Sequence, residues 1–551
     1  MIVHTSRDPH KSRLPRTFTM NHSSFHFHPS AVLRTATLCL SILLFPSAAR
    51  LPAAPAGSKP NVLIIAVDDM NDWVGEFGGN RQTRTPNMDL FCEQGAVAFQ
   101  NAYCPGPICG PSRSAFISGF MPNRSGIYGN GSNMRLSALV QTHATMPEYF
   151  AKNGYQTINR GKFFHKHSTP DGGDEGQWAF TDWIPTDGKG GVDTSHLFSR
   201  QKGIYDGKKG EALRSNDPSD RNDEGVEFSW GPTRDQKENT MDYHTAQWAA
   251  GVLAESHDKP FFLVVGIKKP HLPWYVPQEY FDRFPLESIK IPDYRLDDLD
   301  DILTPSGEKK FSPSADFRWV TQKERSDLFK RAVQAYLACA AYADDCVGVV
   351  LDALAKSTYK DNTVVMIFGD HGWHLGEKLR FRKATLWQEA TRLPLMVRVP
   401  GVTTKRAESM RVVNLMDLYK TLIELCNLPG NPDIDGRSFA PLLKNPSQPW
   451  PYPTMTVNGL GNASIRDERW YYIRYEDGTE EFYDMQADPM QWKNLAQSKD
   501  REIVAAKQQL AARYPTDFAP SISRGFTRDR SGDNSPALPD PNLKRDLSKL
   551  R

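Results

Sequence analysis

Two apolar runs that each end in acidic residues constrain the fold of this chain most. Residues 61–67 lead directly into Asp68 and Asp69, and residues 364–368 lead through a glycine into Asp370. A run that is apolar at every position is typical of a strand buried on both faces, as in the parallel sheets of α/β proteins. The sequence therefore predicts an α/β fold in which a large, mostly parallel sheet is flanked by helices.

The acidic ends of these runs predict a cation site. Ligands of open α/β sheets bind at the carboxyl ends of the strands, where Asp68 and Asp69 follow the first run. Two adjacent carboxylates repel each other unless a cation lies between them. A metal site is therefore favoured here, and a solvated turn is the alternative.

The segment CGPSRSAFISG, residues 109–119, supplies the second chemical feature. Pro111 suits the first turn of a helix, and Arg113 lies four residues after Cys109. A helix N-terminus beside a guanidinium group favours a tetrahedral anion. By itself Cys109 is a nucleophile, a metal ligand or an ordinary thiol. A disulfide with Cys104 is a further alternative that would consume it.

Other polar residues follow predicted strands. Lys162 and His165 come just after a strand that ends at Gly161, and His271 follows the apolar run 261–267 in a loop stiffened by prolines on both sides. A surface lysine and ordinary loop histidines are the alternative interpretations.

Helical patterns separate the strands. One helix is expected after Thr85 as N-cap, with Met88, Leu90 and Phe91 available for packing, and another begins near Asp242 as a cap. A long packing helix is predicted over 327–356.

The overall composition and the N-terminal segment indicate an exported enzyme. The chain has 551 residues and a net charge of only +2, which argues against nucleic-acid binding. We predict a signal peptide with its preceding segment at 1–56, a catalytic domain at 57–445, an α+β subdomain at 446–515 and a flexible tail at 516–551. No later segment is long and apolar enough to span a membrane. The protein is expected in a periplasmic, secreted or lysosome-like compartment, and residues 168–240 are expected to shape the substrate pocket.

Several blocks together make the chain resemble the formylglycine-dependent sulfatases. CGPSRSAFISG fits the signature of that family, and NVLIIAVDD, GKFFH, KKPHLP and GDHGWHLGE occur in the expected order, followed by Lys383. The resemblance covers about residues 61–495 and is strongest to the iduronate-2-sulfatase-like branch, which also has Asp-His at Asp370–His371 and the longer spacing from Lys162 to His165. It implies an alkaline-phosphatase-like fold with a smaller C-terminal antiparallel sheet.

The resemblance also implies a mechanism. Cys109 would be oxidised to formylglycine by a maturation enzyme, and the aldehyde hydrate would attack the sulfate. Its hemiacetal ester could then collapse without water attacking sulfur. The implied ligands of a divalent cation, Ca²⁺ before Mg²⁺, are Asp68, Asp69, Asp370, His371 and an oxygen of the modified Cys109.

The remaining roles follow from the same resemblance. Asp370 would take the proton of the attacking hydroxyl, and Arg113 would hold the hydrated aldehyde. Lys162 and Lys383 would bind sulfate oxygens. His271, with Lys383, would protonate the departing oxygen, and His165 would remove the second hydroxyl proton.

Three functions stay open at this point. Hydrolysis of an O-sulfate ester, on a sulfated carbohydrate such as an iduronate 2-sulfate or on another sulfate ester, fits two lysines around one tetrahedral anion. A phosphodiesterase or phosphonate monoester hydrolase on the same scaffold is the first alternative. A non-catalytic sulfoglycan-binding protein is the second, if Cys109 stays a thiol.

Overall fold

The computed structural model describes residues 59–165, 228–323, 326–522 and 545–551, together with four short strands at 182–184, 198–199, 204–205 and 208–209. The predicted signal peptide at 1–56, most of the proposed pocket-shaping segment at 168–240 and part of the predicted tail lie outside the described residues.

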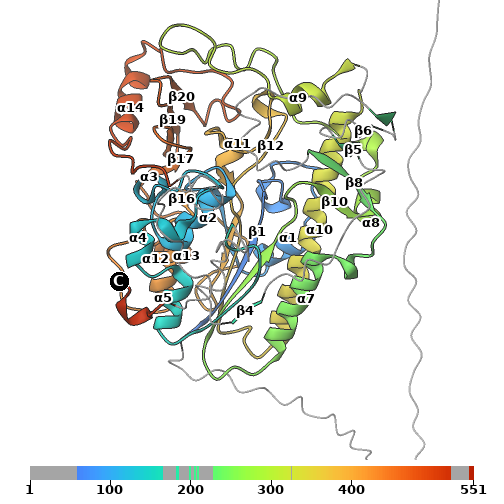
Figure 1. Cartoon of the computed structure of the whole chain (residues 1–551), viewed down its shortest axis with the longest axis vertical. Coiled ribbons are helices and arrows are strands. Elements are labelled where there is room, and N and C mark those ends of the chain that lie inside the picture. The colour runs from blue at the N-terminus through green and yellow to red at the C-terminus, as the bar shows by residue number, and fades with distance from the viewer. Residues whose placement is uncertain are drawn as a thin grey trace, which may run out of the picture. The chain divides into compact units, whose positions relative to one another are not determined.

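A nine-stranded mixed sheet forms the centre of the segment predicted as the catalytic domain (Figure 1). Its order is β14-β2-β15-β11-β1-β9-β3-β4, and β16 also pairs with β2. Five strand pairs are parallel: β1 with β11, β1 with β9, β3 with β9, β3 with β4, and β16 with β2. Three pairs are antiparallel: β15 with β11, β15 with β2, and β14 with β2. The strands are β1 Asn61–Val67, β2 Val97–Tyr103, β3 Gln156–Gly161, β4 Asp182–Ile184, β9 Phe261–Ile267, β11 Thr363–Gly369, β14 Arg392–Leu393, β15 Leu395–Arg398 and β16 Ala407–Asn414. The predicted α/β fold with a mostly parallel sheet is confirmed.

Both faces of the sheet are buried, which explains why β1 is apolar throughout. Leu63 and Ile65 belong to one hydrophobic cluster, and Val62 and Ile64 belong to the other. Successive side chains of a strand point to opposite faces, so each cluster receives every second residue. Full burial of such a side chain contributes about 1.5–3 kcal/mol.

Helices cover the two faces (Figure 1). The first cluster lies under α1 Pro86–Glu93, α7 Met241–Ala254 and the long helix α10 Leu328–Lys356, and the second under α2 Cys109–Ser118, α5 Met146–Lys152, α12 Asp417–Leu425 and α13 Ala440–Lys444. Shorter helices are α3 Pro122–Ser125, α4 Ala138–Thr142, α8 Gln278–Asp282, α9 Ala315–Val320 and α11 Gln388–Thr391. The long helix predicted at 327–356 is confirmed.

The start of α1 differs from its prediction in two respects. Thr85 is the N-cap, but its side chain makes no capping bond, and its hydroxyl accepts the N–H of Gly75 at 2.8 Å. Asp344 on α10 instead accepts the N–H groups of Asn87 and Met88 at 3.0 and 2.8 Å. Leu90 does not pack in the core, since 48% of it is exposed. A carboxylate from a neighbouring helix thus replaces the local cap.

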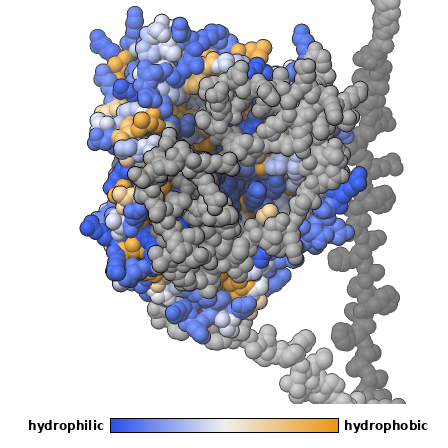
Figure 2. Space-filling view, viewed as in Figure 1, coloured by the Kyte–Doolittle hydropathy of each residue, from blue (hydrophilic) through white to orange (hydrophobic). Residues whose placement is uncertain are grey.

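A second sheet in the C-terminal part is antiparallel and has the order β17-β18-β19-β20. Its strands are β17 Thr454–Val457, β18 Ala463–Arg466, β19 Trp470–Arg474 and β20 Glu480–Asp484, and helix α14 Arg501–Ala511 packs on it. The smaller C-terminal antiparallel sheet that the resemblance implies is present, and β19 and β20 form a hairpin within it. In Figure 2 the surface of this part, at the upper left, is mainly hydrophilic with scattered hydrophobic residues.

A five-stranded sheet has the order β10-β8-β5-β6-β7, and its strand β10 comes from the segment that follows β9. Its strands are β5 Phe198–Ser199, β6 Ile204–Tyr205, β7 Lys208–Lys209, β8 Ser229–Thr233 and β10 Trp274–Pro277. A two-stranded sheet pairs β12 His374–Leu375 with β13 Phe381–Arg382.

Described parts of the predicted tail contact the segment predicted as the catalytic domain. Arg551 donates its N–H to Thr142, and Ala519 donates its N–H to Asn123. Arg545 pairs with the buried Glu148 at 3.3 Å. Residues 545–551 therefore lie against α4 and α5. None of the helices in the described part of the chain is long and apolar enough to cross a membrane.

Candidate active site

Parallel pairing brings the acidic ends of β1 and β11 together. Val67 lies opposite Gly369 in the register, so Asp68 and Asp69 leave the sheet beside Asp370. The N–H of Asp69 donates to Asp370 Oδ1 at 3.0 Å. Asp69 has a φ of 60°, which is uncommon for a residue with a side chain and is often found at functional sites.

Cys109 is the first residue of α2, and its thiol lies among these strand ends. Its Sγ is 3.3 Å from Nε2 of His371, 3.3 Å from Nζ of Lys383 and 3.7 Å from Oδ1 of Asp69. The backbone N–H of Gly110 donates to Asn130 Oδ1 at 2.7 Å, which fixes the start of the helix. All six cysteines of the described residues are free thiols, so the alternative disulfide with Cys104 is not formed.

Arg113 connects the two acidic strand ends. Its guanidinium donates to Asp68 Oδ1 at 3.0 Å and to Asp370 Oδ2 at 2.8 Å, and all three side chains are fully buried. It also donates to the carbonyl oxygens of Lys162 and Phe163 at 2.6 and 3.0 Å. These bonds orient the two carboxylates and the loop after β3. The predicted contact of Arg113 with a hydrated aldehyde at position 109 stays a prediction.

Two lysines contact the two carboxyl groups that follow β1. Lys162 Nζ lies 2.7 Å from Asp68 Oδ2, and Lys383 Nζ lies 2.7 Å from Asp69 Oδ1. Lys383 stands between Arg382 and Ala384, whose φ angles are 75° and 66°. Left-handed backbone at both neighbours of one residue stores strain, which is common where a loop presents a functional side chain.

His271 reaches the same cluster from the loop after β9. Asp242 on α7 holds this loop, because its carboxylate accepts the N–H groups of Lys268 and Lys269, both at 2.9 Å. The ammonium of Lys269 donates to the carbonyl oxygen of His271 at 3.1 Å. The prediction that Asp242 caps α7 is thus wrong: Thr240 is the N-cap, and Asp242 supports the His271 loop.

Burial dominates the protonation of these groups. Burial raises the pKa of Asp69 to about 8, against the opposing effect of Lys383. Burial also opposes ionisation of Asp68, yet Lys162 and Arg113 hold the pKa of Asp68 well below its usual range. Burial raises the pKa of the Cys109 thiol well above its ordinary value. The unmodified Cys109 is therefore a neutral thiol at neutral pH.

The histidines are neutral for the same reason. Burial lowers the pKa of His371 to about 4, and burial, with Lys383 and Lys162 nearby, lowers the pKa of His271 well below its ordinary value. Neutral imidazole is the form in which histidine binds metals.

The donor set fits a hard cation. Ligand atoms of Asp68, Asp69, Cys109 and His271 lie within 4.8 Å of one another, and so do those of Cys109, Asp370 and His371. Asp69 Oδ2 is buried and has no hydrogen-bond partner among the described residues, so it can accept a ligand. Carboxylate oxygens are the ligands that Ca²⁺ and Mg²⁺ prefer. Any cation held here shares its carboxylates with Arg113 and Lys383.

The structure brings together most of the residues predicted for the site. Cys109, Arg113, Lys162, His271, Lys383 and the four predicted metal ligands Asp68, Asp69, Asp370 and His371 form one buried cluster. His165 lies three residues after Lys162 and is half-buried, and its role stays a prediction. Sequence analysis missed the supporting roles of Asp242 and Lys269. An acid in the first turn of a helix resembles a cap, and only the tertiary contact shows otherwise.

Comparison with known proteins connects this site to one family. The family model described as Sulfatase matches residues 60–428, and the one described as N-sulphoglucosamine sulphohydrolase, C-terminal, matches residues 369–514. A protein named Sulfatase from Formosa agariphila is 36% identical over 453 residues, which cover 80% of this chain and 83% of that protein. Human iduronate 2-sulfatase is 30% identical over 427 residues, which cover 69% of this chain and 71% of that protein.

Solved structures show the same fold at lower identity. A protein in complex with its substrate D-glucosamine-2-N,6-O-disulfate aligns with a TM-score of 0.60 and 20% identity, covering 83% of this chain and 98% of that chain. A phosphonate monoester hydrolase from Silicibacter pomeroyi aligns with a TM-score of 0.63 and 19% identity, covering 82% of this chain and 94% of that chain.

Proposed function

This chain belongs to the sulfatase family and is a sulfuric ester hydrolase, and from that premise we propose that it cleaves an O-sulfate ester of a carbohydrate with a formylglycine formed from Cys109. The observation that carries the proposal is the position of Cys109 Sγ, 3.3 Å from both Lys383 Nζ and His371 Nε2. A group at this position lies where cations can hold a tetrahedral anion.

The protonation of Cys109 supports the modified residue as nucleophile. Its thiol is fully buried and its pKa is raised well above the ordinary value by that burial. A thiol attacks only as the thiolate, so the unmodified residue would be a weak nucleophile at neutral pH. An aldehyde hydrate offers two hydroxyl groups, one to attack sulfur and one from which sulfate release can start. The maturation enzyme that the resemblance implies would install it.

The proposed cation is Ca²⁺, with Mg²⁺ as the alternative. The proposed ligands are Asp68, Asp69, Asp370, His371 and an oxygen at position 109. Oδ2 of Asp69, which is buried and has no hydrogen-bond partner among the described residues, supports this assignment. Such a cation polarises sulfate oxygens and lowers the pKa of an attacking hydroxyl.

The lysines and histidines then have distinct tasks. Lys162 and Lys383 bind the sulfate oxygens, for which they exchange part of their present bonds to Asp68 and Asp69. Asp370 takes the proton of the attacking hydroxyl. Arg113 keeps Asp370 oriented through the bond of 2.8 Å to Oδ2 and, by the family resemblance, holds the hydrate.

Proton transfer to the leaving oxygen is assigned to Nε2 of His271, together with Lys383. That atom is buried and has no hydrogen-bond partner among the described residues. His271 is neutral without substrate because burial lowers its pKa. An anionic sulfate placed beside the imidazole of His271 favours its protonated form, so substrate binding raises the pKa of His271 and allows it to act as the general acid. His165 is assigned the second hydroxyl proton.

The proposed substrate class rests on the relatives. The resemblance to iduronate 2-sulfatase favours a sulfated carbohydrate, and export to a periplasmic, secreted or lysosome-like compartment would bring the enzyme to such polymers. No nucleic-acid partner is proposed.

Peptide mass spectrometry across Cys109 tests the nucleophile directly. Protein exported by the native host should yield a peptide in which the thiol of Cys109 is replaced by an aldehyde. The same preparation should hydrolyse 4-nitrophenyl sulfate, and Cys109→Ala should not. An unmodified cysteine in an active preparation would refute the formylglycine, and full activity of Cys109→Ala would refute the site.

Phosphonate or phosphodiester hydrolysis is the second candidate, because a phosphonate monoester hydrolase shares the fold. Comparing kcat/KM for 4-nitrophenyl sulfate with that for 4-nitrophenyl phenylphosphonate separates the two. A higher value for the phosphonate would favour the second candidate. Binding of sulfated oligosaccharides without turnover of either, with Cys109 unmodified, would favour the sulfoglycan-binding alternative.

A further inference from the structure

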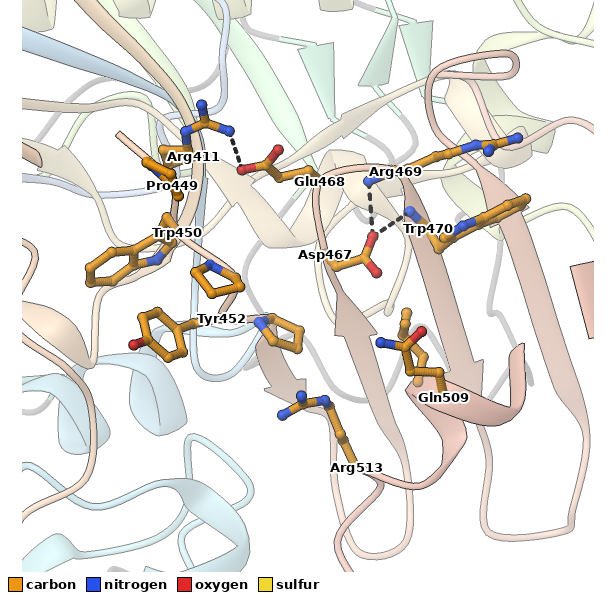
Figure 3. Close-up of a pocket in the computed structure, with 13 residues that line it drawn as sticks. Arg411, Pro449, Trp450, Tyr452, Asp467, Glu468, Arg469, Trp470, Gln509 and Arg513 are labelled. Atoms are coloured by element: carbon orange, nitrogen blue, oxygen red, sulfur yellow. Dashed lines mark hydrogen bonds and ion pairs between the residues drawn. The ribbon is translucent and has the colours of Figure 1, made fainter. Parts of the chain in front are cut away.

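Two adjoining cavities in the C-terminal part share a wall made by Trp450 and Tyr452. The larger, of about 550 Å³, is also lined by residues of β19 and α14, and the smaller, of about 280 Å³, by Arg437 and by Met121 from the segment after α2. Arg513, just after α14, lines both. Figure 3 shows the larger cavity with the aromatic wall on one side and Arg513 projecting toward it.

The aromatic wall is held rigidly. The rings of Trp450 and Tyr452 pack edge to face with centroids 4.9 Å apart. The indole N–H of Trp450 donates to the carbonyl oxygen of Val412 at 3.0 Å, and Trp450 is only 8% exposed. Tyr452, by contrast, is 41% exposed. The exposed part of Tyr452, held in place by Trp450, is an aromatic surface against which a sugar ring can pack.

The charges around this wall favour an anion. Arg437 lies over the ring of Tyr452, with its Cζ 3.7 Å from the centroid. Arg513 forms no ion pair among the described residues. Arg437 lies near Asp417, a buried carboxylate that also lines the smaller cavity and accepts the backbone N–H groups of Asn414 and Arg437 at 2.9 and 2.7 Å. The neighbouring acids are already engaged: Glu468 pairs with Arg411, and Asp467 Oδ1 accepts the N–H groups of Arg469 and Trp470 at 2.9 and 2.7 Å (Figure 3). The guanidinium of Arg513 is thus available to a ligand, and that of Arg437 adds positive charge beside Tyr452.

The cavities are separate from the catalytic cluster. Cys109 begins α2, and Met121, which lines the smaller cavity, follows the end of that helix. The ten residues of α2 correspond to about 15 Å of helix. A ligand at the aromatic wall therefore cannot be the sulfate ester being hydrolysed at Cys109.

We propose that Trp450, Tyr452, Arg437 and Arg513 form a second binding site for an anionic sugar unit of a sulfated polysaccharide. The sugar ring packs against the exposed part of Tyr452, and Arg513, together with the Arg437 guanidinium that lies over the Tyr452 ring, binds its sulfate or carboxylate oxygens. The choice of a polysaccharide rests on the proposed function. Holding a long chain at this site raises its effective concentration at the catalytic cluster without changing the chemical step.

Equilibrium binding to full-length Cys109→Ala protein tests the site, because no turnover occurs. The probes are a heparin hexasaccharide and the same hexasaccharide after chemical desulfation, at low salt. Combining Tyr452→Ala with Arg513→Ala should weaken binding of the sulfated probe about tenfold, whereas Arg501→Ala, an exposed arginine at the other end of α14, should leave it unchanged. Equal affinity of the double variant, or equal binding of the desulfated probe, overturns the proposal.

Activity of the otherwise native enzyme separates this proposal from the proposed function. The Tyr452/Arg513 double variant should keep its kcat/KM for 4-nitrophenyl sulfate and show a higher KM for the polysaccharide with kcat unchanged. An enzyme inactive on every sulfate ester would refute the proposed function, while the binding measurement would still decide the second site. If the double variant of an active enzyme keeps an unchanged KM for the polysaccharide, the second binding site is refuted. Thermal denaturation of the variant and the wild type under the same conditions shows whether the variant is folded.

Discussion

The Nε2 atom of His271 lies 4.0 Å from Oδ2 of Asp69, and neither atom has a hydrogen-bond partner among the described residues. Both side chains are buried, and an unpaired buried polar group costs about 1–3 kcal/mol. The remaining carboxylate oxygen of Asp69 is bonded to Lys383, and Arg113 and Lys162 are bonded to Asp68 and Asp370. The two unpaired atoms therefore mark the side of the cluster from which a ligand is received.

Removing the ammonium of Lys383 should nearly abolish catalysis. Its Nζ lies 2.7 Å from Asp69 Oδ1 and 3.3 Å from Cys109 Sγ, so it faces the reacting position directly. Lys383→Ala should lower kcat/KM for 4-nitrophenyl sulfate by about 10²–10³-fold, the loss typical of one charged stabilising group. Lys405→Ala, at an exposed lysine, is the matched control. A loss smaller than threefold would contradict the position assigned to Lys383.

Asp242 should affect catalysis through the His271 loop. Asp242→Ala leaves the N–H groups of Lys268 and Lys269 without their acceptor, and we expect a loss of about 1–3 kcal/mol in the free energy of unfolding. Misplacement of His271 should slow a sugar sulfate, whose leaving oxygen needs a proton, far more than 4-nitrophenyl sulfate. Asp242→Asn, which keeps one acceptor, should show a smaller effect. An equal decrease for both substrates would indicate a purely structural role.

A divalent cation should stabilise the folded protein. Treating the full-length enzyme with EDTA should lower its Tm, and Ca²⁺ should restore it, because a ligand at a thousand times its Kd stabilises by about 4 kcal/mol. Asp69→Asn removes a predicted ligand and should reduce the shift. If neither Ca²⁺ nor Mg²⁺ changes the Tm, and elemental analysis finds no metal, the assigned cation site is wrong.

The buried cap of α1 should make stability depend on pH. Burial raises the pKa of Asp344 to about 7, from an ordinary value of 3.8, despite its bonds from Asn87 and Met88. Between these values the unfolded chain has released the proton and the folded chain keeps it. This group therefore makes stability fall as pH rises, by at most about 1.4 kcal/mol per pH unit.

Urea denaturation of the wild type and Asp344→Asn between pH 4 and pH 8 measures this effect. The advantage of the wild type over the variant should shrink as the pH rises through this window. A difference that stays constant, or grows with pH, would contradict the raised pKa.

The sequence alone was sufficient for the central sheet and for the chemical types in the site. Continuous apolar runs such as 61–67 require burial on both faces, and that requirement is met only inside a sheet covered by helices. The parallel pairing then places Asp68 and Asp370 at one edge. Local pattern was insufficient for α1, where Leu90 is exposed and the cap comes from Asp344.

Tertiary structure decided which of these groups meet. Lys383 contacts Asp69 across 314 residues of sequence, and Arg113 joins Asp68 to Asp370 across both strand ends. The support of His271 by Asp242 and the second cavity beside Tyr452 likewise depend on how distant elements pack. Strand and helix signals are local because they reflect a residue's own burial. Distances between charged side chains depend on sheet order and helix packing, which bring together segments far apart in the chain.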